Sequence, residues 1–296
     1  MSGKATGSGK KSKFQKIGPG ASRREETIMH RYRTTALAGA VLALFITAAC
    51  AAPEEGTATL TAPAAEMPAA IDYSVFVETP GRPDADIIAD ELRRPAAVLA
   101  LFSPQPGDVI VELEAGSGYY TEIFSRAVGA AGTVYMQNPA GFDNFLGDSV
   151  SKRLDGRLTN VTYLKNDFDG LDLPDASADT VTWFQGPHEL WYRTERNPDG
   201  FGDPDGAFAE IARVLKPGGR FVAIDHVAPA GSPPTTGGDT HRIDPAIIQA
   251  YAEAAGLTLE TTSSLLHNPA DDGLKNVFDP EIRGKTDQAI LIFRKD

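Results

Sequence analysis

Cysteine is nearly absent from this 296-residue sequence: Cys50 is the only one, so no disulfide can form within the chain. Positive charge is also scarce, because 28 Lys and Arg residues stand against 40 Asp and Glu residues, giving a net charge of -12. A protein that binds the nucleic-acid backbone needs the opposite sign, so we expect no nucleic-acid partner. The hydrophobic fraction of 42% and the charged fraction of 23% are typical of a globular protein, which excludes a wholly disordered chain.

The most apolar segment is too short to cross a bilayer. Residues 36–49 are uncharged and mostly apolar, whereas a membrane-spanning helix needs about 20 such residues and the apolar core of a signal peptide about 7–15. Arg31 and Arg33 precede this segment and supply the positive charge that a signal peptide carries. Residues 1–50 hold nine basic and two acidic residues, and such an asymmetry indicates a targeting segment rather than part of the fold.

The apolar run ends in Thr47-Ala48-Ala49-Cys50, which resembles a bacterial lipobox. The resemblance implies export, a lipid on Cys50, and membrane attachment on the periplasmic side of the cell envelope. An ordinary cleaved signal peptide and a retained anchor are the alternatives. We therefore expect residues 1–50 to be a disordered n-region with a signal peptide and lipobox. Residues 51–70, rich in Ala, Pro, Thr and Glu, form a flexible tether, and residues 71–296 form the folded domain.

Segments typical of strands and helices alternate within the domain. The predicted strands are 109–113, 133–136, 161–164, 180–184, 220–225, 257–260 and 289–293. The predicted helices are 84–101, with a break at Arg94-Pro95, then 119–128, 208–215 and 245–255. This alternation predicts an α/β domain whose seven-stranded, mostly parallel sheet is covered by helices on both faces. Ligands of such sheets bind beyond the carboxyl ends of the strands.

The first predicted strand runs into a glycine loop, Glu112-Leu113-Glu114-Ala115-Gly116-Ser117-Gly118, which opens a helix. Glycines at such a position let the backbone approach a ligand and direct free N–H groups toward it. Thr121 replaces the third glycine of a dinucleotide-binding loop, which disfavours NAD and FAD. The acid expected on a ribose about twenty residues later is replaced by Gln137-Asn138.

Three motifs together resemble class I S-adenosylmethionine-dependent methyltransferases: Glu112 to Gly118, Asp167 after the third strand, and Val214-Leu215-Lys216-Pro217-Gly218-Gly219. The resemblance covers approximately residues 90–296. Shorter stretches, such as residues 134–139 and 284–287, resemble an exported bacterial group of predicted methyltransferases. The resemblance implies a single Rossmann-like methyltransferase domain, S-adenosyl-L-methionine as cofactor, and methyl transfer to a small-molecule substrate.

The resemblance also implies which residues contact the cofactor. The glycine backbone would approach its methionyl part, and Glu112 would order the loop or receive the ammonium group. Glu114 stands where the family usually has its first glycine, so its carboxylate would point away or favour the positive charge of the cofactor. Asn138 would meet the ribose, and Asp167 with Phe168 the adenine. The expected cofactor-binding residues are Glu112, Glu114, Gly116, Gly118, Asn138, Asp167 and Phe168.

Three histidines near strand ends are candidates for catalysis, because a histidine can take a proton from the methyl acceptor. His188 follows the fourth predicted strand, His226 follows the fifth, and His241 precedes a helix. Tyr120 completes the expected catalytic set. A capping or packing role is the alternative for His188, and packing is the alternative for Tyr120. None of the histidines shows a short ligand spacing such as His-x-x-x-His, so the sequence predicts no metal site.

The expected substrate-binding residues are Tyr119, Trp191 and Arg242. Tyr119 and Trp191, together with Tyr120, would wall an aromatic pocket around a cation, and Arg242 would bind an anionic substrate. An envelope protein that binds a ligand without catalysis is the alternative function, because S-adenosylmethionine is made and used in the cytoplasm whereas the leader predicts export.

Overall fold

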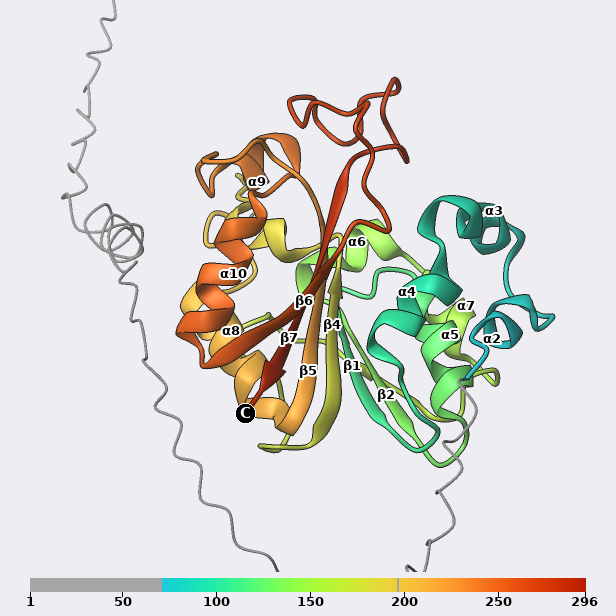
Figure 1. Cartoon of the computed structure of the whole chain (residues 1–296). Coiled ribbons are helices and arrows are strands. Elements are labelled where there is room, and N and C mark those ends of the chain that lie inside the picture. The colour runs from blue at the N-terminus through green and yellow to red at the C-terminus, as the bar shows by residue number, and fades with distance from the viewer. Residues whose placement is uncertain (1–70, 196) are drawn as a thin grey trace, which may run out of the picture. The chain divides into compact units, whose positions relative to one another are not determined.

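The computed structural model describes residues 71–195 and 197–296 (Figure 1). The predicted signal peptide, Cys50 and the predicted tether lie outside these residues. Among the helices in the described part of the chain, none has the length and apolar character needed to cross a membrane.

A seven-stranded sheet forms the centre of the domain. Its strands are β1 (Val109–Leu113), β2 (Thr133–Gln137), β3 (Val161–Leu164), β4 (Ala178–Phe184), β5 (Leu215–His226), β6 (Leu257–Ser263) and β7 (Gln288–Lys295). They lie in the order β3-β2-β1-β4-β5-β7-β6. The first five run parallel, and β7 pairs antiparallel with both β5 and β6. This confirms the predicted α/β fold with a mostly parallel seven-stranded sheet.

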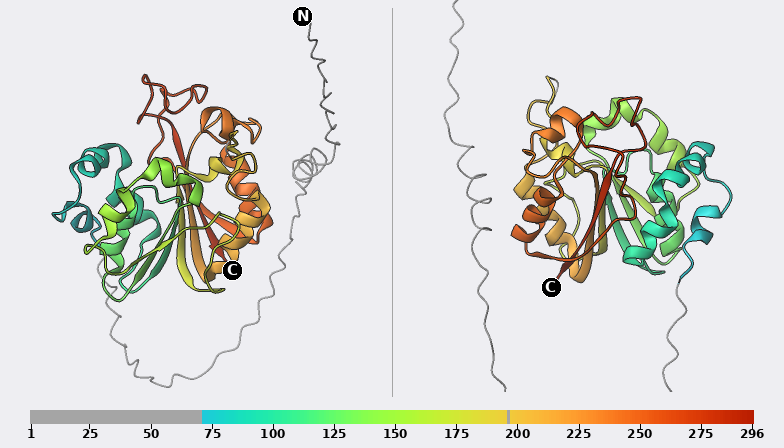
Figure 2. Two further views of the ribbon diagram at one scale, coloured as in Figure 1. Left: turned by 180° about the vertical axis from the view of Figure 1, so that it is seen from behind. Right: turned by 45° about the horizontal axis from the view of Figure 1, so that its top comes forward.

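Helices cover both faces of the sheet (Figures 1 and 2). The α-helices are α2 (Ser74–Glu78), α3 (Asp84–Arg93), α4 (Pro95–Phe102), α5 (Tyr119–Val128), α6 (Asp143–Leu146), α7 (Ser149–Leu154), α8 (Pro204–Val214), α9 (Thr236–Thr240) and α10 (Pro245–Ala254), and the 3-10 helices are η2 (Ala140–Phe142) and η3 (Pro187–Trp191). Helices α4 and α5 pack on one face, and α8 and α10 on the other. Successive strand residues point to opposite faces of the sheet. Ile110 therefore packs in the core under α4 and α5, and Val111 packs in the core under α8 and α10.

Most predicted elements have the expected bounds, and the exceptions have local causes. Arg94 adopts a left-handed conformation with φ 47°, which separates α3 from α4 at the predicted break. Helix α8 begins earlier than predicted because the Asp203 side chain caps it, accepting a hydrogen bond from the Gly206 N–H at 3.0 Å. The predicted Lys-Pro-Gly-Gly turn lies inside β5, since Leu215 pairs with Ala178 before a register shift.

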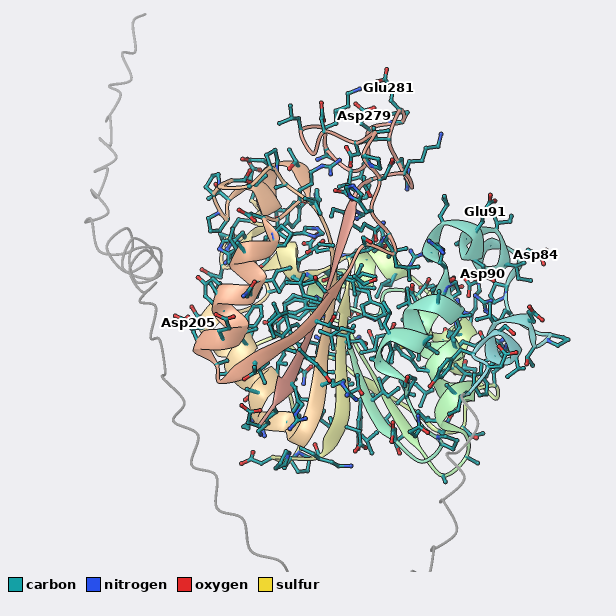
Figure 3. The ribbon with its side chains drawn as sticks, viewed as in Figure 1. Asp84, Asp90, Glu91, Asp205, Asp279 and Glu281 are labelled. Atoms are coloured by element: carbon teal, nitrogen blue, oxygen red, sulfur yellow. The ribbon has the colours of Figure 1, made fainter. Side chains whose placement is uncertain are left out.

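The strand order reverses its direction between β1 and β4. The chain leaves β1 toward β2 on one side and reaches β4 on the other, and ligands of such sheets bind where the order reverses. The β6–β7 connection, residues 264–287, extends beyond the same edge of the sheet (Figure 1). Figure 3 shows Asp279 and Glu281 at its outer end, away from the strands.

Candidate functional site

The glycine loop after β1 is held by the two amide side chains at the end of β2. The Gly116 N–H donates to Asn138 Oδ1 at 2.8 Å, and Asn138 Nδ2 donates to the Gly116 carbonyl at 3.0 Å. Gln137 Oε1 accepts from the Glu114 N–H at 3.0 Å. Asn138 is fully buried, and both ends of its amide bind the loop. The predicted contact of Asn138 with a ribose is therefore replaced by a structural role.

Gly116 borders open space at the carboxyl edge of the sheet. Its φ is +57°, and a Cβ added there would have no described atom within 4 Å. Gly118 is the N-cap of α5, and the Glu122 N–H donates to its carbonyl at 3.2 Å. The N–H groups that precede Glu122 in the helix have no partner inside it, as at every helix N-terminus. Gly116 therefore leaves room for close approach, whereas the loop N–H groups of Glu114, Ala115, Gly116 and Gly118 already have acceptors.

Glu112 and Glu114 flank this loop in different environments. Glu112 is buried, accepts a hydrogen bond from the Thr121 hydroxyl, and has its pKa raised to about 8 by burial. These contacts support the predicted loop-ordering role. Glu114 has φ 51° and accepts from Trp183 Nε1 at 3.0 Å. Burial also raises the pKa of Glu114 well above its ordinary value, and its side chain lies between the loop and the end of β4.

The two residues predicted to contact adenine differ in exposure. Asp167 is exposed after β3, and partial burial together with the nearby Asp169 raises its pKa. Phe168 is fully buried, and its ring lies 4.5 Å from that of Trp183 in the core. Apolar packing therefore covers the Phe168 ring, and its contact with the cofactor stays a prediction. The contact of Asp167 with the adenine stays a prediction, and the residue follows β3 at the expected edge of the sheet.

The predicted aromatic pocket does not form. The Tyr119 hydroxyl donates to Asp90 at 2.6 Å, and the Tyr120 hydroxyl donates to the Arg93 carbonyl at 3.3 Å. Both tyrosines belong to the core on the α4 and α5 face, whereas Trp191 packs against the core on the opposite face. Burial raises the pKa of Tyr120, which keeps its hydroxyl protonated. The prediction of a shared pocket is therefore wrong, and the catalytic role of Tyr120 stays a prediction.

Two of the predicted histidines meet in one place with two carboxylates. His188 on η3 directs Nδ1 at Asp225 Oδ1 of β5, 2.8 Å away. Its Nε2 lies 3.3 Å from His241 Nδ1 and 3.4 Å from Glu189 Oε1. His241 Nδ1 also lies 3.0 Å from Glu189 Oε1. These four residues form the His188 cluster, and all but His241 are buried.

The charge on the His188 ring decides whether it can act as a general base. Burial opposes a charge on His188, but Asp225 and Glu189 outweigh it and raise the pKa of the ring to about 10. Burial would raise the pKa of Glu189, yet the two histidines lower it. A ring that is protonated on both nitrogens at neutral pH cannot accept a further proton. The predicted general-base role of His188 therefore does not fit this arrangement.

His226 and Arg242 stand apart from the cluster. His226 Nδ1 lies 2.7 Å from the Thr286 hydroxyl, and burial lowers the pKa of the ring to about 3, so it is neutral at pH 7. Arg242 is fully buried, and its guanidinium binds both carboxylate oxygens of Asp271 and the carbonyl oxygens of Lys275 and Val227. The prediction that Arg242 binds substrate is wrong, because these internal partners occupy its donors.

Sequence reasoning missed two residues of the cluster, Glu189 and Asp225. Both are polar residues at or just after the carboxyl end of a buried strand, which is the edge where such folds place ligands. That signal was present in the sequence. The pairing of Asp225 with His188 was not, because 37 positions separate them.

Comparisons with known proteins agree with the fold. Residues 111–223 match the family described as "Methyltransferase domain". The ubiquinone/menaquinone biosynthesis C-methyltransferase UbiE of Teredinibacter turnerae is 32% identical over 135 residues, 45% of this chain and 49% of that protein. The same enzyme from Caulobacter sp. is 30% identical over 139 residues, 45% and 50% of the two chains. This chain therefore spans about half the length of these relatives.

A solved structure shares the fold. A SAM-dependent methyltransferase from Aquifex aeolicus superposes with a TM-score of 0.50 at 20% identity, over 76% of this chain and 100% of that one. The described domain therefore has the fold of the class I methyltransferase superfamily, and residues 111–223 match a methyltransferase domain. S-adenosyl-L-methionine is the cofactor that this superfamily indicates.

Proposed function

We propose that this chain is an S-adenosylmethionine-dependent methyltransferase acting on a small acceptor. The observation that supports this most is the opening at Gly116, which lies at the β1–β4 switch point within the segment that matches methyltransferases. The residues present fit the cofactor, because the loop leaves room where an added Cβ would stand and the first turn of α5, which follows it, has N–H groups without a helical partner. Asp167 lies at the same edge, after β3.

The bound cofactor would supply an electrophilic methyl group on a sulfonium. An electron pair of the acceptor forms the new bond to the methyl carbon while the carbon–sulfur bond breaks, leaving a neutral thioether. The residues of this chain act by holding donor and acceptor in line. Asn138 and Gln137 fix the loop, and neutral His226 at the end of β5 remains a candidate for contact with the acceptor. The alternative, an envelope ligand-binding protein without catalysis, is not favoured by the family match.

Replacing Gly116 with Leu tests this function. The new side chain would fill the space where the cofactor is proposed to bind, in a conformation that costs about 1–2 kcal/mol. We expect the affinity for S-adenosylmethionine to fall by about tenfold or more, equivalent to about 1.4 kcal/mol. Isothermal titration calorimetry of the full chain measures it. Gly156→Leu is the matched control, since Gly156 also has positive φ beside open space but precedes β3.

Two outcomes would contradict the proposal. If the unaltered chain binds neither S-adenosylmethionine nor its demethylated product, the function is wrong while the fold stands. If Gly116→Leu binds as tightly as Gly156→Leu, the cofactor lies elsewhere.

We also propose that lipid on Cys50 holds the protein on the periplasmic side of the cell envelope. Support comes from Arg31 and Arg33, the short apolar run of residues 36–49, and the Thr-Ala-Ala-Cys sequence that ends at Cys50. Positive charges are retained on the cytoplasmic side of a membrane, so an acidic segment after the run suits export.

Replacing Cys50 with Ser should move the protein from the membrane to a soluble fraction, or leave an uncleaved precursor. Fractionation, followed by mass spectrometry of the mature N-terminus, measures both results. Ala58→Ser, in the predicted tether, is the control and should fractionate like the unaltered chain. If Cys50→Ser behaves as that control does, Cys50 is not the anchor.

A further inference from the structure

The His188 cluster presents three electron-pair donors to one point. His188 Nε2, Glu189 Oε1 and His241 Nδ1 are separated by 3.3, 3.4 and 3.0 Å. We propose that these three atoms bind a divalent transition metal, with zinc as the expected ion. The proposal goes beyond methyl transfer and does not depend on it.

Two of the three donor-atom separations match tetrahedral coordination, and the third, between His241 Nδ1 and Glu189 Oε1, is shorter at 3.0 Å. Zinc binds imidazole nitrogen at about 2.0–2.1 Å and carboxylate oxygen at about 2.0–2.2 Å, so neighbouring ligand atoms lie about 3.3–3.5 Å apart. The three measured separations reach from 3.0 to 3.4 Å. Two imidazoles disfavour magnesium and calcium, which take oxygen ligands, and favour zinc and its neighbours in the transition series.

Asp225 orients the first ligand. Its Oδ1 faces His188 Nδ1 at 2.8 Å, so the proton of the neutral ring belongs on Nδ1 and the lone pair of Nε2 points at the metal position. The carboxylate is itself fixed, because it accepts the backbone N–H of His188 at 2.8 Å and that of His226 at 2.7 Å. A carboxylate bound to the far nitrogen of a histidine ligand is the usual partner in zinc sites.

A proton accounts for these contacts when no metal is bound. The protonated His188 ring donates from Nδ1 to Asp225 and directs its Nε2–H toward Glu189 Oε1, 3.4 Å away. A divalent cation would take the place of the Nε2 proton, and its two charges would balance the carboxylates of Glu189 and Asp225.

The backbone around the triangle is arranged to bring His241 close. His241 adopts φ 55°, a conformation that costs a non-glycine residue energy, at the end of α9. Helix α9 approaches η3 so closely that a Cβ on Gly237 would lie 2.3 Å from the His188 carbonyl oxygen. The rings of Tyr192 and Phe278 each lie 4.9 Å from the His241 ring and cover its sides.

The sequence prediction of no metal site depended on ligand spacing. His188 and Glu189 are adjacent, and the third ligand, His241, is 53 positions from His188. A search for ligands at short sequence spacing cannot find these three residues, because α9 and η3 come together only in the folded domain. The geometry therefore favours the opposite of that prediction.

The test measures metal binding to the full chain, purified without a histidine tag and stripped with a chelator. Titration with zinc should show one ion per chain, and cobalt should give the strong visible absorption of tetrahedral coordination. His241→Ala should lower zinc affinity about a hundredfold or more. His226→Gln is the matched control, because this partly buried histidine lies 6.1 Å from the His188 ring yet is not one of the proposed ligands.

Further variants keep the test informative if His241→Ala does not fold, as circular dichroism would show. Glu189→Gln preserves side-chain volume while removing an anionic ligand, and Asp225→Asn should lower affinity about 10–100-fold through its effect on His188. Cys50→Ser should bind zinc unchanged. The absence of stoichiometric zinc or cobalt binding overturns the proposal, as does binding that survives in both the His241→Ala and the Glu189→Gln variants.

Discussion

Replacing Arg242 with Ala is expected to lower the free energy of unfolding by about 3–5 kcal/mol, because it leaves a buried carboxylate without its partner. The side chains of Arg242 and Asp271 are 0% and 2% exposed, and they form two hydrogen bonds of 2.9 and 3.0 Å. The same guanidinium also donates to the Lys275 and Val227 carbonyls. Chemical denaturation followed by circular dichroism measures the change.

A surface ion pair provides the control. Arg220 and Glu260 make a comparable contact at 2.7 Å, but their side chains are 39% and 36% exposed. Exposed pairs contribute about 0–1 kcal/mol, so Arg220→Ala should have a small effect. If Arg242→Ala and Arg220→Ala lower the free energy of unfolding equally, burial of the pair between Arg242 and Asp271 does not increase its contribution to stability.

The Arg242 pair also bears on the metal proposal. Arg242 follows His241 directly and ties the β6–β7 connection to the end of β5. Phe278, on the same connection, packs against the His241 ring. Loosening this connection should therefore weaken zinc binding as well as the fold.

The architecture could be predicted because its signals are local. Short runs of β-branched and aromatic residues such as 109–113 and 161–164 form strands wherever both faces are covered. Proline after Arg94 predicts the break between two helices, and that break is observed. The glycine loop occupies its expected place between a strand and a helix.

The roles of individual polar residues were harder to predict, because they depend on partners distant in the sequence. Asn138 was expected to bind a ligand, yet it binds the backbone of Gly116, 22 positions earlier. Arg242 similarly meets Asp271, 29 positions later. A sequence shows that a polar side chain lies near a ligand edge, but not whether the chain itself has already taken its hydrogen bonds. Burial decides this, and it follows from packing of the whole domain.

Glu112 gives the last prediction, a change in how stability depends on pH. Burial raises the pKa of this carboxyl from its ordinary value of 4.5 to about 8, against the opposing effects of Thr121 and Arg153. Between these values the folded protein holds a proton that the unfolded chain has released. This proton contributes to the free energy of unfolding by an amount on the order of 5 kcal/mol. The contribution is fully present below about pH 4.5 and is lost as the pH rises to about 8.

Replacing Glu112 with Gln removes this loss, because the amide cannot ionise and its oxygen still accepts from the Thr121 hydroxyl. The variant should gain stability relative to the unaltered chain between pH 5 and 8, and the difference should then level off. Denaturation at intervals across pH 5–9 measures it. Glu260→Gln is the control, since Arg220 lowers the pKa of that exposed carboxyl below its ordinary value of 4.5, so its ionisation should leave the slope between pH 5 and 9 unchanged. Parallel profiles for Glu112→Gln and the unaltered chain would mean that Glu112 ionises as an ordinary carboxyl does.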